Sequence, residues 1–440
     1  MKQKVCPVRN RRFSNGAWVI SVNMGYGHQR AVFPLKDLAP GGKIICANDY
    51  QGIPEKDRKV WEGTKGFYEF ISKFKKVPLL GQFVFFIFNQ FQKIFSFYPK
   101  RDLSKPNFQL KQIYSLIKNG WGEHLIRQLC SRKDSKLLPL ITTFFTVAFM
   151  AEFFKYPGEI FCLVCDTDIS RAWAPLDPKK SKIKYLAPTQ RAVERLKLYG
   201  VRPKNIFLTG FPLPSENLET LKRDLSSRIL NLDTKGKYFE KYKSLVKKYL
   251  GELPKEPNHA LTIMFAVGGA GAQKEIGVRI VKSLAEKIKS GRVKVILAAG
   301  VRKEVRDYFK RNTKGLSVDP HHQNFGVGVD VLFGKDFEDY YKKFNSALKT
   351  TDILWTKPSE LSFYTALGLP VVVAPPLGSQ EKFNREWLFQ LGSAINQKNP
   401  DYADQWLFDL LDSGWFAEAA LQGFVEAEKF GVLNIKKIIS

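Results

Sequence analysis

Two glycine-rich turns hold the residues whose types and spacing most directly indicate chemistry. The first is Gly25-Tyr-Gly-His28, which follows the apolar run 17–22, and the second is Gly268-Gly-Ala-Gly-Ala-Gln273, which follows 260–267. A glycine turn that opens a helix presents backbone N–H groups which, with the helix dipole, can hold a pyrophosphate. An imidazole such as that of His28 can act as a general base near neutral pH. Either turn can also be a tight strand–helix connection that binds nothing, and the second matches neither the GxGxxG nor the P-loop pattern.

Polar side chains follow three other apolar runs, where the carboxyl ends of parallel strands would present them to a ligand. These side chains are Asp166 and Asp168, Lys357 and Glu360, and Gln380, Glu381 and Asn384. The two aspartates are alternative candidates for the base. Glu360 either caps the next helix or accepts hydrogen bonds from a ribose. The last three residues, two amides and a carboxylate, suit the hydroxyl groups of a sugar.

The elements that must position these residues alternate between strand and helix in both halves of the chain. Expected strands are 17–22, 43–47, 160–165, 184–187 and 206–209 in the first half, and 260–267, 293–298, 327–332, 353–355 and 371–374 in the second. Strand, glycine turn and helix form the first unit of a doubly wound sheet. The predicted fold class is therefore α/β, with two Rossmann-like halves.

The chain of 440 residues is longer than one hydrophobic core usually supports, so we expect several parts. Residues 1–220 form an N-terminal Rossmann-like domain. Residues 221–256, rich in Lys and Arg and without a strand pattern, form a solvated helical connector. Residues 257–395 form the second Rossmann-like domain, and residues 396–440 form helices that pack back toward the first one.

The charge balance indicates an anionic partner. Lys and Arg total 70 against 42 Asp and Glu, which leaves a formal charge of +28. Such an excess suits nucleic acid, acidic lipid headgroups or a phosphate-bearing substrate. No recognisable nucleic-acid-binding scaffold accompanies it, so no nucleic-acid partner is expected. The hydrophobic share of 44% excludes a disordered chain.

An aromatic stretch at 79–98 is too interrupted by polar residues for a membrane-spanning helix. Its phenylalanines, Phe85, Phe88 and Phe95 among them, and the flanking cations such as Lys100 and Arg101 are typical of a helix lying at a membrane surface. The alternative is that this stretch fills the core of the first domain. The basic segment 1–12 has no apolar region behind it, so we expect no signal peptide.

Taken in order, these motifs resemble the GT-B glycosyltransferases of the group that holds monogalactosyldiacylglycerol synthase and the peptidoglycan N-acetylglucosaminyltransferase. The likeness spans residues 17–395. The matching motifs are Met24-Gly-Tyr-Gly-His28, Asp166-Thr-Asp-Ile-Ser-Arg-Ala-Trp173, Tyr185-Leu-Ala-Pro188, Thr209-Gly-Phe-Pro212, Gly268-Gly-Ala-Gly271, Thr356-Lys-Pro358, Gly368-Leu-Pro370, and Gln380-Glu381 with Asn384. Arg171 departs from the pattern, because the synthases have histidine there. The segment between Lys357 and Gly368 is also shorter than in the synthases.

The resemblance implies two Rossmann-like domains facing each other across a cleft, and transfer of a sugar from a nucleotide-sugar, UDP-sugar foremost, to a lipid or lipid-linked acceptor. It implies inversion without a bound metal and without a cofactor, with His28 as the base. The implied donor-binding residues are Gly268, Gly269, Ala270, Gly271, Gln273, Lys357, Glu360, Gln380, Glu381 and Asn384. The implied acceptor or membrane residues are Gly25, Gly27, Trp173, Phe85, Phe88 and Phe95.

The expected location is the cytoplasm, with the protein bound peripherally to the inner face of the cell membrane at anionic lipid. Two alternatives remain open from the sequence. One is a GT-B epimerase or hydrolase that acts on a soluble nucleotide-sugar and needs neither the aromatic stretch nor its basic flanks. The other is a non-catalytic basic module that binds membrane or nucleic acid.

Overall fold

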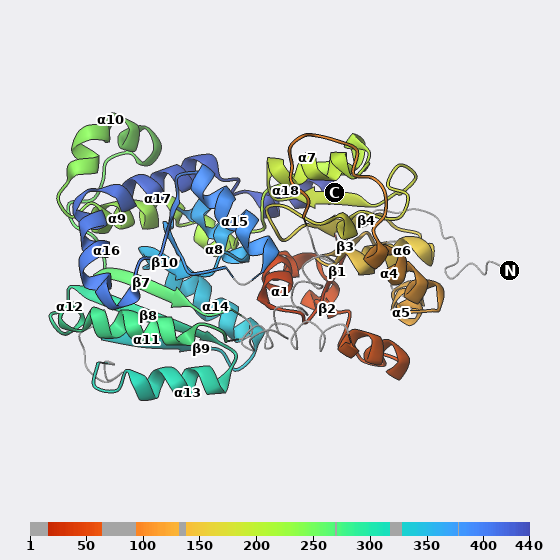
Figure 1. Ribbon diagram of the computed structural model, residues 1–440, viewed down its shortest axis with the longest axis horizontal. Helices are drawn as coiled ribbons and strands as arrows, with labels where there is room; N and C mark the ends of the chain where they lie inside the picture. The colour runs from red at the N-terminus through yellow and green to blue at the C-terminus, as the bar shows by residue number, and fades with distance from the viewer. Residues whose placement is uncertain (1–15, 64–93, 132–137, 269–270, 317–327, 377) are drawn as a thin grey trace. The chain divides into compact units, whose positions relative to one another are not determined.

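Two compact units divide the chain in the computed structural model (Figure 1). One unit comprises Met1–Pro212 together with Phe430–Ser440, and the other comprises Leu213–Lys429. The structure describes residues 16–63, 94–131, 138–268, 271–316, 328–376 and 378–440. We refer to the two parts as the N-terminal unit and the C-terminal unit.

The N-terminal unit contains a parallel sheet with strand order β2-β1-β3-β4-β5-β6. Its strands are β1 Trp18–Ser21, β2 Ile45–Cys46, β3 Leu140–Thr142, β4 Ile160–Leu163, β5 Lys184–Ala187 and β6 Ile206–Leu208. All residues of β1, β3 and β4 are buried, as expected for strands that are covered on both faces. The order reverses at β1, which has β2 on one side and β3 on the other.

Helices cover this sheet and supply most of its core. They are α1 Tyr26–Val32, α4 Phe108–Lys118, α5 Glu123–Ser131, α6 Phe145–Phe153, α7 Gln190–Leu198 and α18 Gly431–Ile439. Two of these helices begin at an N-cap side chain. The side-chain oxygen of Asn107 accepts from Leu110 N (2.9 Å) at the start of α4, and that of Thr189 accepts from Ala192 N (3.1 Å) at the start of α7. Helix α6 is buried from Phe145 through Ala151, so it packs on more than one side.

The C-terminal unit contains a second parallel sheet, with strand order β12-β11-β10-β7-β8-β9. Its strands are β7 Leu261–Ala266, β8 Val293–Gly300, β9 Gly328–Phe333, β10 Ile353–Thr356, β11 Val371–Val373 and β12 Ala394–Asn396. Here the order reverses at β7, which lies between β8 and β10. The α/β fold class predicted from the sequence, with two Rossmann-like units, is confirmed.

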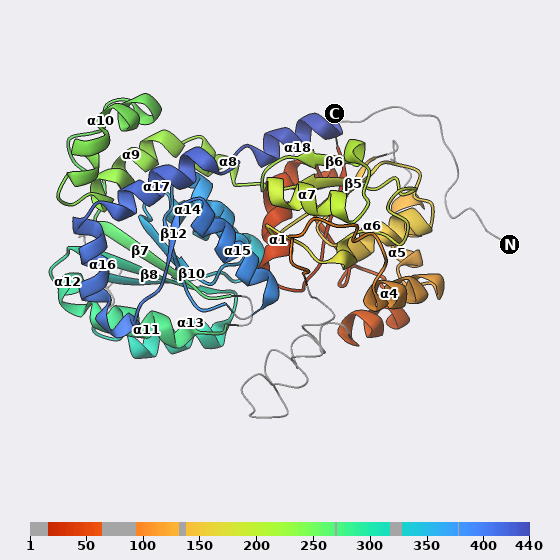
Figure 2. The ribbon, with the colours of Figure 1, turned by 45° about the horizontal axis from the view of Figure 1, so that its top comes forward.

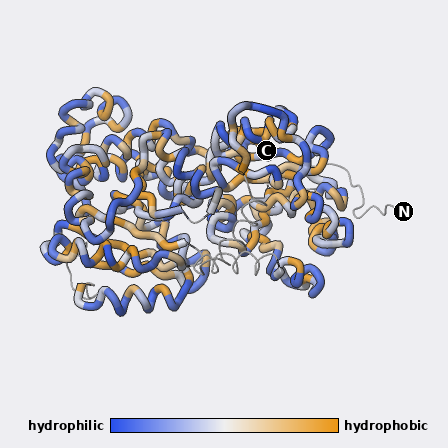
Figure 3. The backbone as a smooth tube through the Cα atoms, viewed as in Figure 1, coloured by the Kyte–Doolittle hydropathy of each residue, from blue (hydrophilic) through white to orange (hydrophobic). Residues whose placement is uncertain are grey.

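The helices of this unit lie on both faces of its sheet. They are α8 Ser215–Leu218, α9 Leu221–Leu232, α10 Lys237–Leu250, α11 Lys274–Ser283, α12 Ala285–Lys289, α13 Lys303–Asn312, α14 Phe337–Leu348, α15 Ser379–Gln390, α16 Ala403–Asp412 and α17 Trp415–Glu426. Figure 2 shows α11 and α13 on one face, and α14, α15 and α17 on the other. In Figure 3 the central strands carry the hydrophobic colour along most of their length, which agrees with the complete burial of β7.

The predicted solvated connector 221–256 is instead part of the C-terminal unit. Helix α9 is largely buried and packs against α17, and Arg228 in particular is only 2% exposed. Its guanidinium donates to the carbonyl oxygens of Thr351 (2.7 Å), Leu367 (2.7 Å) and Leu348 (3.1 Å). Burial lowers the pKa of Arg228 to about 10. The prediction of a solvated connector relied on the high Lys and Arg content of this segment. It was wrong for α9, because the guanidinium of Arg228 is buried and bonded to backbone carbonyl oxygens.

The prediction that residues 396–440 all pack toward the first domain holds only for the last helix. Helices α16 and α17 belong to the C-terminal unit, and only 430–440 belong to the N-terminal unit. There Asn434 Nδ2 donates to Thr209 O (2.9 Å), and Lys436 forms an ion pair with Asp37.

The aromatic stretch 79–98 is described only from Ile94 onward, so Phe85 and Phe88 lie outside the described residues. Ile94 is buried, whereas Phe95 is 39% exposed and Tyr98 is 67% exposed. Among the helices in the described part of the chain, none has the length and apolar character needed to cross a membrane.

Candidate active site

His28 lies at the point where the strand order of the N-terminal sheet reverses. It belongs to α1, which follows β1, and in doubly wound sheets ligands bind outside the carboxyl ends of the strands at such a reversal. Gly25 precedes the helix with φ of 120°, a conformation that favours glycine, and Gly27 lies in the first turn. Asn48 Oδ1 accepts from Asn23 N (2.8 Å), so the loop that follows β1 is held to the loop that follows β2.

The imidazole of His28 is oriented by the neighbouring strand β3. Its Nδ1 lies 2.9 Å from the carbonyl oxygen of Thr143, and its ring meets that of Phe144 edge-on at 5.2 Å. A carbonyl oxygen can only accept, so Nδ1 carries the proton in the neutral ring and Nε2 keeps its lone pair. This is the tautomer that a general base needs, because Nε2 can then take a proton from a bound hydroxyl group.

The two aspartates proposed as alternative bases differ sharply in environment. Asp168 forms a bidentate ion pair with Arg195, with N–O distances of 2.7 and 2.8 Å, and both side chains are at most 2% exposed. A carboxylate used in this way holds the loop after β4 to α7, so the geometry favours a structural role for Asp168. Asp166 is partly exposed at the end of the same strand.

Trp173, expected near the acceptor, is 6% exposed and lies in the core of the N-terminal unit. Its ring packs against that of Phe145 at 5.2 Å, and its carbonyl oxygen accepts from Tyr185 Oη (2.8 Å). The motif 166–173 suggested Trp173 as an acceptor residue, but in the structure its side chain packs in the core of the N-terminal unit. Direct contact with an acceptor would require it to leave this core.

Arg171, which replaces the histidine of the synthases, binds backbone rather than ligand. It is 1% exposed, and its guanidinium donates to Ser104 O (2.6 and 3.0 Å) and to Pro175 O (3.0 Å), with a further bond to Ala174 O. Burial lowers the pKa of this guanidinium. Arg171, the residue that departs from the motif pattern, therefore holds the segment that contains Ser104 in place.

The C-terminal unit gathers the predicted donor residues at its own strand reversal. The loops after β7, β10 and β11 all leave the carboxyl edge of the sheet, because these three strands are parallel neighbours. The Nε2 of Gln273 donates to Pro375 O (3.0 Å), which joins the first of these loops to the third. Gln273 itself has φ of 64° and directly precedes α11.

The glycine loop is constrained by close neighbours at both ends. A Cβ on Gly268 would lie 2.5 Å from Lys357 Cε, so the lysine side chain runs directly over this backbone. A Cβ on Gly271, which has φ of 68°, would lie 2.8 Å from Val305 Cγ2. Gly271 thus needs glycine for both space and conformation, whereas at Gly268 the neighbour is the flexible end of the Lys357 side chain. Gly269 and Ala270 lie outside the described residues.

Lys357 and Glu381 form an ion pair at this edge, 2.5 Å between Nζ and Oε1, with side chains 22% and 12% exposed. Glu381 stands in the first turn of α15 and Gln380 beside it is partly exposed. Asn384 is buried and donates to Pro358 O (3.1 Å), so it supports the turn after β10 rather than facing solvent. Glu360, 8% exposed, opens the 3₁₀ helix Glu360–Leu367.

Arg302 is a candidate that the sequence reasoning missed. It precedes α13 after β8, the other neighbour of β7, and its Cδ would lie 3.4 Å from a Cβ on Gly271. The guanidinium contacts Glu304 Oε1 (3.3 Å) and remains 39% exposed. Arg302 follows the carboxyl end of β8, where ligands bind in such sheets, so the same rule applied to β8 would have identified it. Arg302 and Lys357 place two cations beside the glycine loop, a charge suited to a diphosphate.

No cluster of three His, Cys, Asp or Glu side chains that could hold a metal ion occurs in the described parts of the chain. The two sets of residues described above are an oriented imidazole in one unit, and a glycine loop with adjacent cations and amides in the other.

Comparison with known proteins gives three kinds of similarity. Residues 254–384 match a family described as "Domain of unknown function (DUF6938)". The chain is 22% identical over 317 residues to the processive diacylglycerol beta-glucosyltransferase of Bacillus subtilis (strain 168), a match that covers 71% of this chain and 68% of that protein. The chain is thus similar in sequence to a glycosyltransferase across most of its length.

Solved structures of low sequence identity are also similar. S. aureus MnaA in a co-structure with UDP has a TM-score of 0.43 at 13% identity, and the match covers 82% of this chain and 85% of that chain. Acinetobacter baumannii MurG has a TM-score of 0.42 at 12% identity, with 75% and 77% covered.

Proposed function

We propose that the protein is a glycosyltransferase that moves a sugar from a UDP-sugar to a lipid or lipid-linked acceptor. The observation that carries this proposal is the convergence of the glycine loop, Lys357 and Glu381 at the strand reversal of the C-terminal sheet. That set offers backbone N–H groups and a cation for a diphosphate, with carboxylate and amide groups for a sugar. The similarity to a diacylglycerol glucosyltransferase supports the class of acceptor.

In the proposed reaction His28 Nε2 takes the proton from the acceptor hydroxyl as its oxygen attacks the anomeric carbon. The Nδ1–H bond to Thr143 O keeps the ring in the required tautomer and stabilises the imidazolium that forms. Attack from the face opposite the leaving group inverts the anomeric carbon. We propose no metal ion and no cofactor for this step, and the nucleotide-sugar is a substrate.

The leaving UDP carries the negative charge that develops in the transition state. We propose that backbone N–H groups of the loop from Gly268 to Gln273 and the ammonium group of Lys357 stabilise it, with Arg302 nearby. Glu360 is proposed for the ribose, and Gln380 and Glu381 for the sugar hydroxyls. Asn384 serves this site by holding the turn at Pro358.

Exposed aromatic and basic side chains lie together in the segment 95–101 of the N-terminal unit. Phe95 and Tyr98 are exposed, next to Lys100 and Arg101, and this mixture suits a membrane surface. We propose peripheral attachment to anionic lipid on the cytoplasmic face, where nucleotide-sugars and lipid acceptors can meet. No nucleic-acid partner is proposed.

The decisive experiment incubates the purified protein with a panel of UDP-sugars, with and without diacylglycerol in mixed micelles. The proposal predicts UDP release that depends on the lipid, together with a glycolipid product of inverted anomeric configuration. Lipid-independent conversion of a UDP-sugar to its epimer, or its hydrolysis, would replace the proposal with the epimerase or hydrolase alternative. UDP binding without any turnover across sugars and acceptors would favour a binding module.

A further inference from the structure

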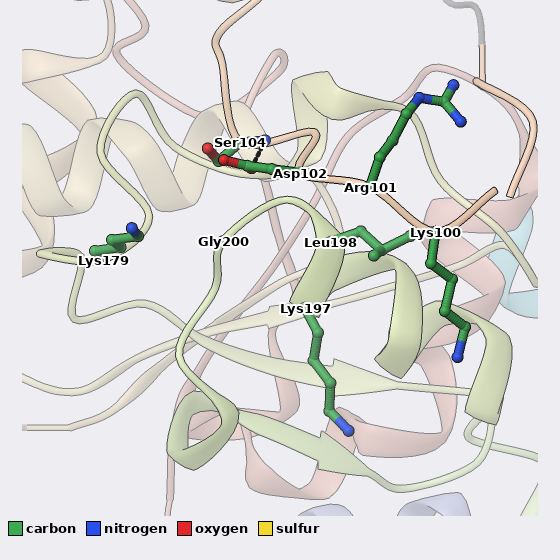
Figure 4. Close-up of a pocket in the computed structure, with 8 residues that line it drawn as sticks. All are labelled: Lys100, Arg101, Asp102, Ser104, Lys179, Lys197, Leu198 and Gly200. Carbon is green, nitrogen blue, oxygen red and sulfur yellow. Dashed lines mark hydrogen bonds between the residues drawn. The ribbon is translucent and has the colours of Figure 1, made fainter. Parts of the chain in front are cut away.

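A hollow of about 400 Å³ on the N-terminal unit does not gather its charged groups toward one point. The ammonium groups of Lys100, Lys179 and Lys197 end apart from one another around it (Figure 4), and Lys197 is already paired with Glu194 at 2.8 Å. Hydrogen-bonding groups of the same unit do converge at the carboxyl edge of its sheet, where β1 and β2 end.

The side chain of Asn48 continues the pairing of β1 and β2 beyond the last residues of both strands. The parallel ladder matches Ser21 with Cys46, and Ala47 N then donates to Ser21 O (2.8 Å). Two residues after Ser21, Asn23 N donates to Asn48 Oδ1 (2.8 Å), and Asn48 Nδ2 faces Asn23 O at 3.5 Å. One carboxamide thus takes the place of a backbone peptide group, because it carries a donor and an acceptor side by side.

The orientation of this carboxamide follows from its neighbours. Its oxygen accepts from Asn23 N and from the thiol of Cys46 (3.1 Å between Sγ and Oδ1), while its nitrogen faces a carbonyl oxygen. Burial raises the pKa of the Cys46 thiol, so the thiol stays protonated and remains a donor. An aspartate could accept the same two bonds, but it would turn a second oxygen toward Asn23 O. Asparagine is therefore the residue type that suits both sides of this contact.

The segment that Asn48 holds leads directly into the helix that carries His28. Gly25 lies between Asn23 and α1, with φ of 120°. Glycine has the widest backbone freedom and no side chain to cap a helix, so the start of α1 needs support from other elements. Asn48 supplies it from the loop after β2. The bond from His28 Nδ1 to Thr143 O (2.9 Å) supplies it from the loop after β3, so the backbone and the imidazole each have a support.

We propose that Asn48 is a positioning residue, which keeps the imidazole of His28 on Thr143 O by fixing the loop between β1 and α1. Displacement of a reacting group by about 1 Å can lower a rate by about 10²-fold, even when the altered residue is remote from the chemistry. Loss of the carboxamide releases Asn23 and lets α1 begin in more than one way, so Nε2 reaches the acceptor hydroxyl for less of the time. The effect on turnover rests on the proposed transferase function, whereas the effect on the imidazole does not.

The test compares Asn48→Ala, which removes both contacts, with Asn48→Asp, which keeps the acceptor for Asn23 N. The matched control is Asn205→Ala. Asn205 also donates to a backbone oxygen, Ser181 O (3.2 Å), and it directly precedes β6, at the amino edge of the same parallel sheet. Thermal unfolding verifies that the variants are folded. Asn48→Gln, which displaces the carboxamide by one methylene, replaces Asn48→Ala if that variant does not fold.

Turnover is measured as UDP release in the presence of the lipid acceptor. We expect kcat to fall tenfold or more in Asn48→Ala while KM for the UDP-sugar stays within threefold, because the proposed donor residues belong to the other unit. Asn48→Asp and the control are expected to keep kcat within threefold of wild type. A smaller loss in Asn48→Ala, or an equal loss in the control, overturns the proposal.

The second readout needs no turnover. The chain contains five histidines, and isotopic labelling gives NMR signals for their ring nitrogens; the pair that disappears in His28→Asn belongs to His28. In the neutral wild-type ring Nδ1 carries the proton, so its two nitrogens differ widely in chemical shift. In Asn48→Ala we expect the two shifts to move toward each other, because the Nδ1–H tautomer loses its support, and in the control we expect no change.

This spectrum also separates the positioning role from the transferase proposal. Ring shifts of His28 that are the same in Asn48→Ala as in wild type would refute the positioning role, whatever the activity. If the wild-type protein transfers no sugar, the transferase proposal fails, and the ring shifts alone decide the role of Asn48.

Discussion

Replacement of His28 tests the proposal that its imidazole acts as the general base. The substitution His28→Ala removes both the base at Nε2 and the Nδ1–H bond to Thr143 O. Loss of a positioned general base lowers kcat by about 10²–10⁴-fold. At about 1.4 kcal/mol for each tenfold, this corresponds to about 3–6 kcal/mol of transition-state stabilisation.

The lost hydrogen bond contributes far less, because one neutral hydrogen bond is worth about 1 kcal/mol net. The variant His28→Asn separates the two effects. The amide N–H of asparagine reaches a position similar to Nδ1 and can still donate to Thr143 O, but it offers no base. We therefore expect Asn and Ala to lose activity almost equally, while Asn keeps more of the wild-type unfolding free energy.

The assay measures UDP release and transfer of labelled sugar to lipid, with UDP affinity measured separately by calorimetry. UDP affinity should stay within about threefold of wild type, since the proposed donor residues belong to the other unit. A His28→Ala enzyme that keeps more than a tenth of its kcat would refute the reasoning. In that event Asp166, which is partly exposed at the end of β4, becomes the base to test.

Three further substitutions test other parts of the structure. Gly271→Ala places a methyl group 2.8 Å from Val305 Cγ2 at a φ of 68°, so calorimetry should show weaker UDP binding and urea unfolding a loss of about 1–3 kcal/mol; unchanged values would mean that the loop relaxes freely. Lys357→Met should weaken UDP binding by about 1.5–3 kcal/mol while melting stays close to wild type, and equal affinity would remove this lysine from the donor site. Asp168→Asn leaves Arg195 buried with its charge unmatched and should cost about 3–5 kcal/mol in urea unfolding; a stable but inactive variant would instead restore Asp168 as a catalytic candidate.

Local pattern was sufficient to predict most elements of both sheets. The expected strand 260–267 is observed as β7 Leu261–Ala266, and the expected strand 353–355 is observed as β10 Ile353–Thr356. Long buried strands and capped amphipathic helices carry their signal within a few neighbouring residues, so no tertiary information is needed. Two three-residue strands, β3 and β12, were not predicted, and β3 lies within an apolar segment that continues into α6.

The candidate site residues were likewise predictable only in part from the sequence. The residue types of the two glycine turns are visible in the sequence because each turn must adjoin its own strand and helix. The partners that give those residues their roles are distant along the chain: Thr143 orients His28 from 115 residues away, and Glu381 pairs with Lys357 across 24 residues. Spacing cannot reveal such pairs, since they exist only when parallel strands bring their carboxyl ends together.

The sequence by itself therefore determined the α/β class, the two glycine turns and the net positive charge, because periodicity, turn chemistry and composition are local or additive properties. Only the tertiary structure decided which charged groups are available. Asp168 and Arg228 are used inside their units, Arg171 holds the backbone at Ser104, and Lys357 pairs with Glu381 at the carboxyl edge of the C-terminal sheet. The physical reason is burial: a charge removed from water must find its partners within the fold, and the path of the whole chain decides which charges those are.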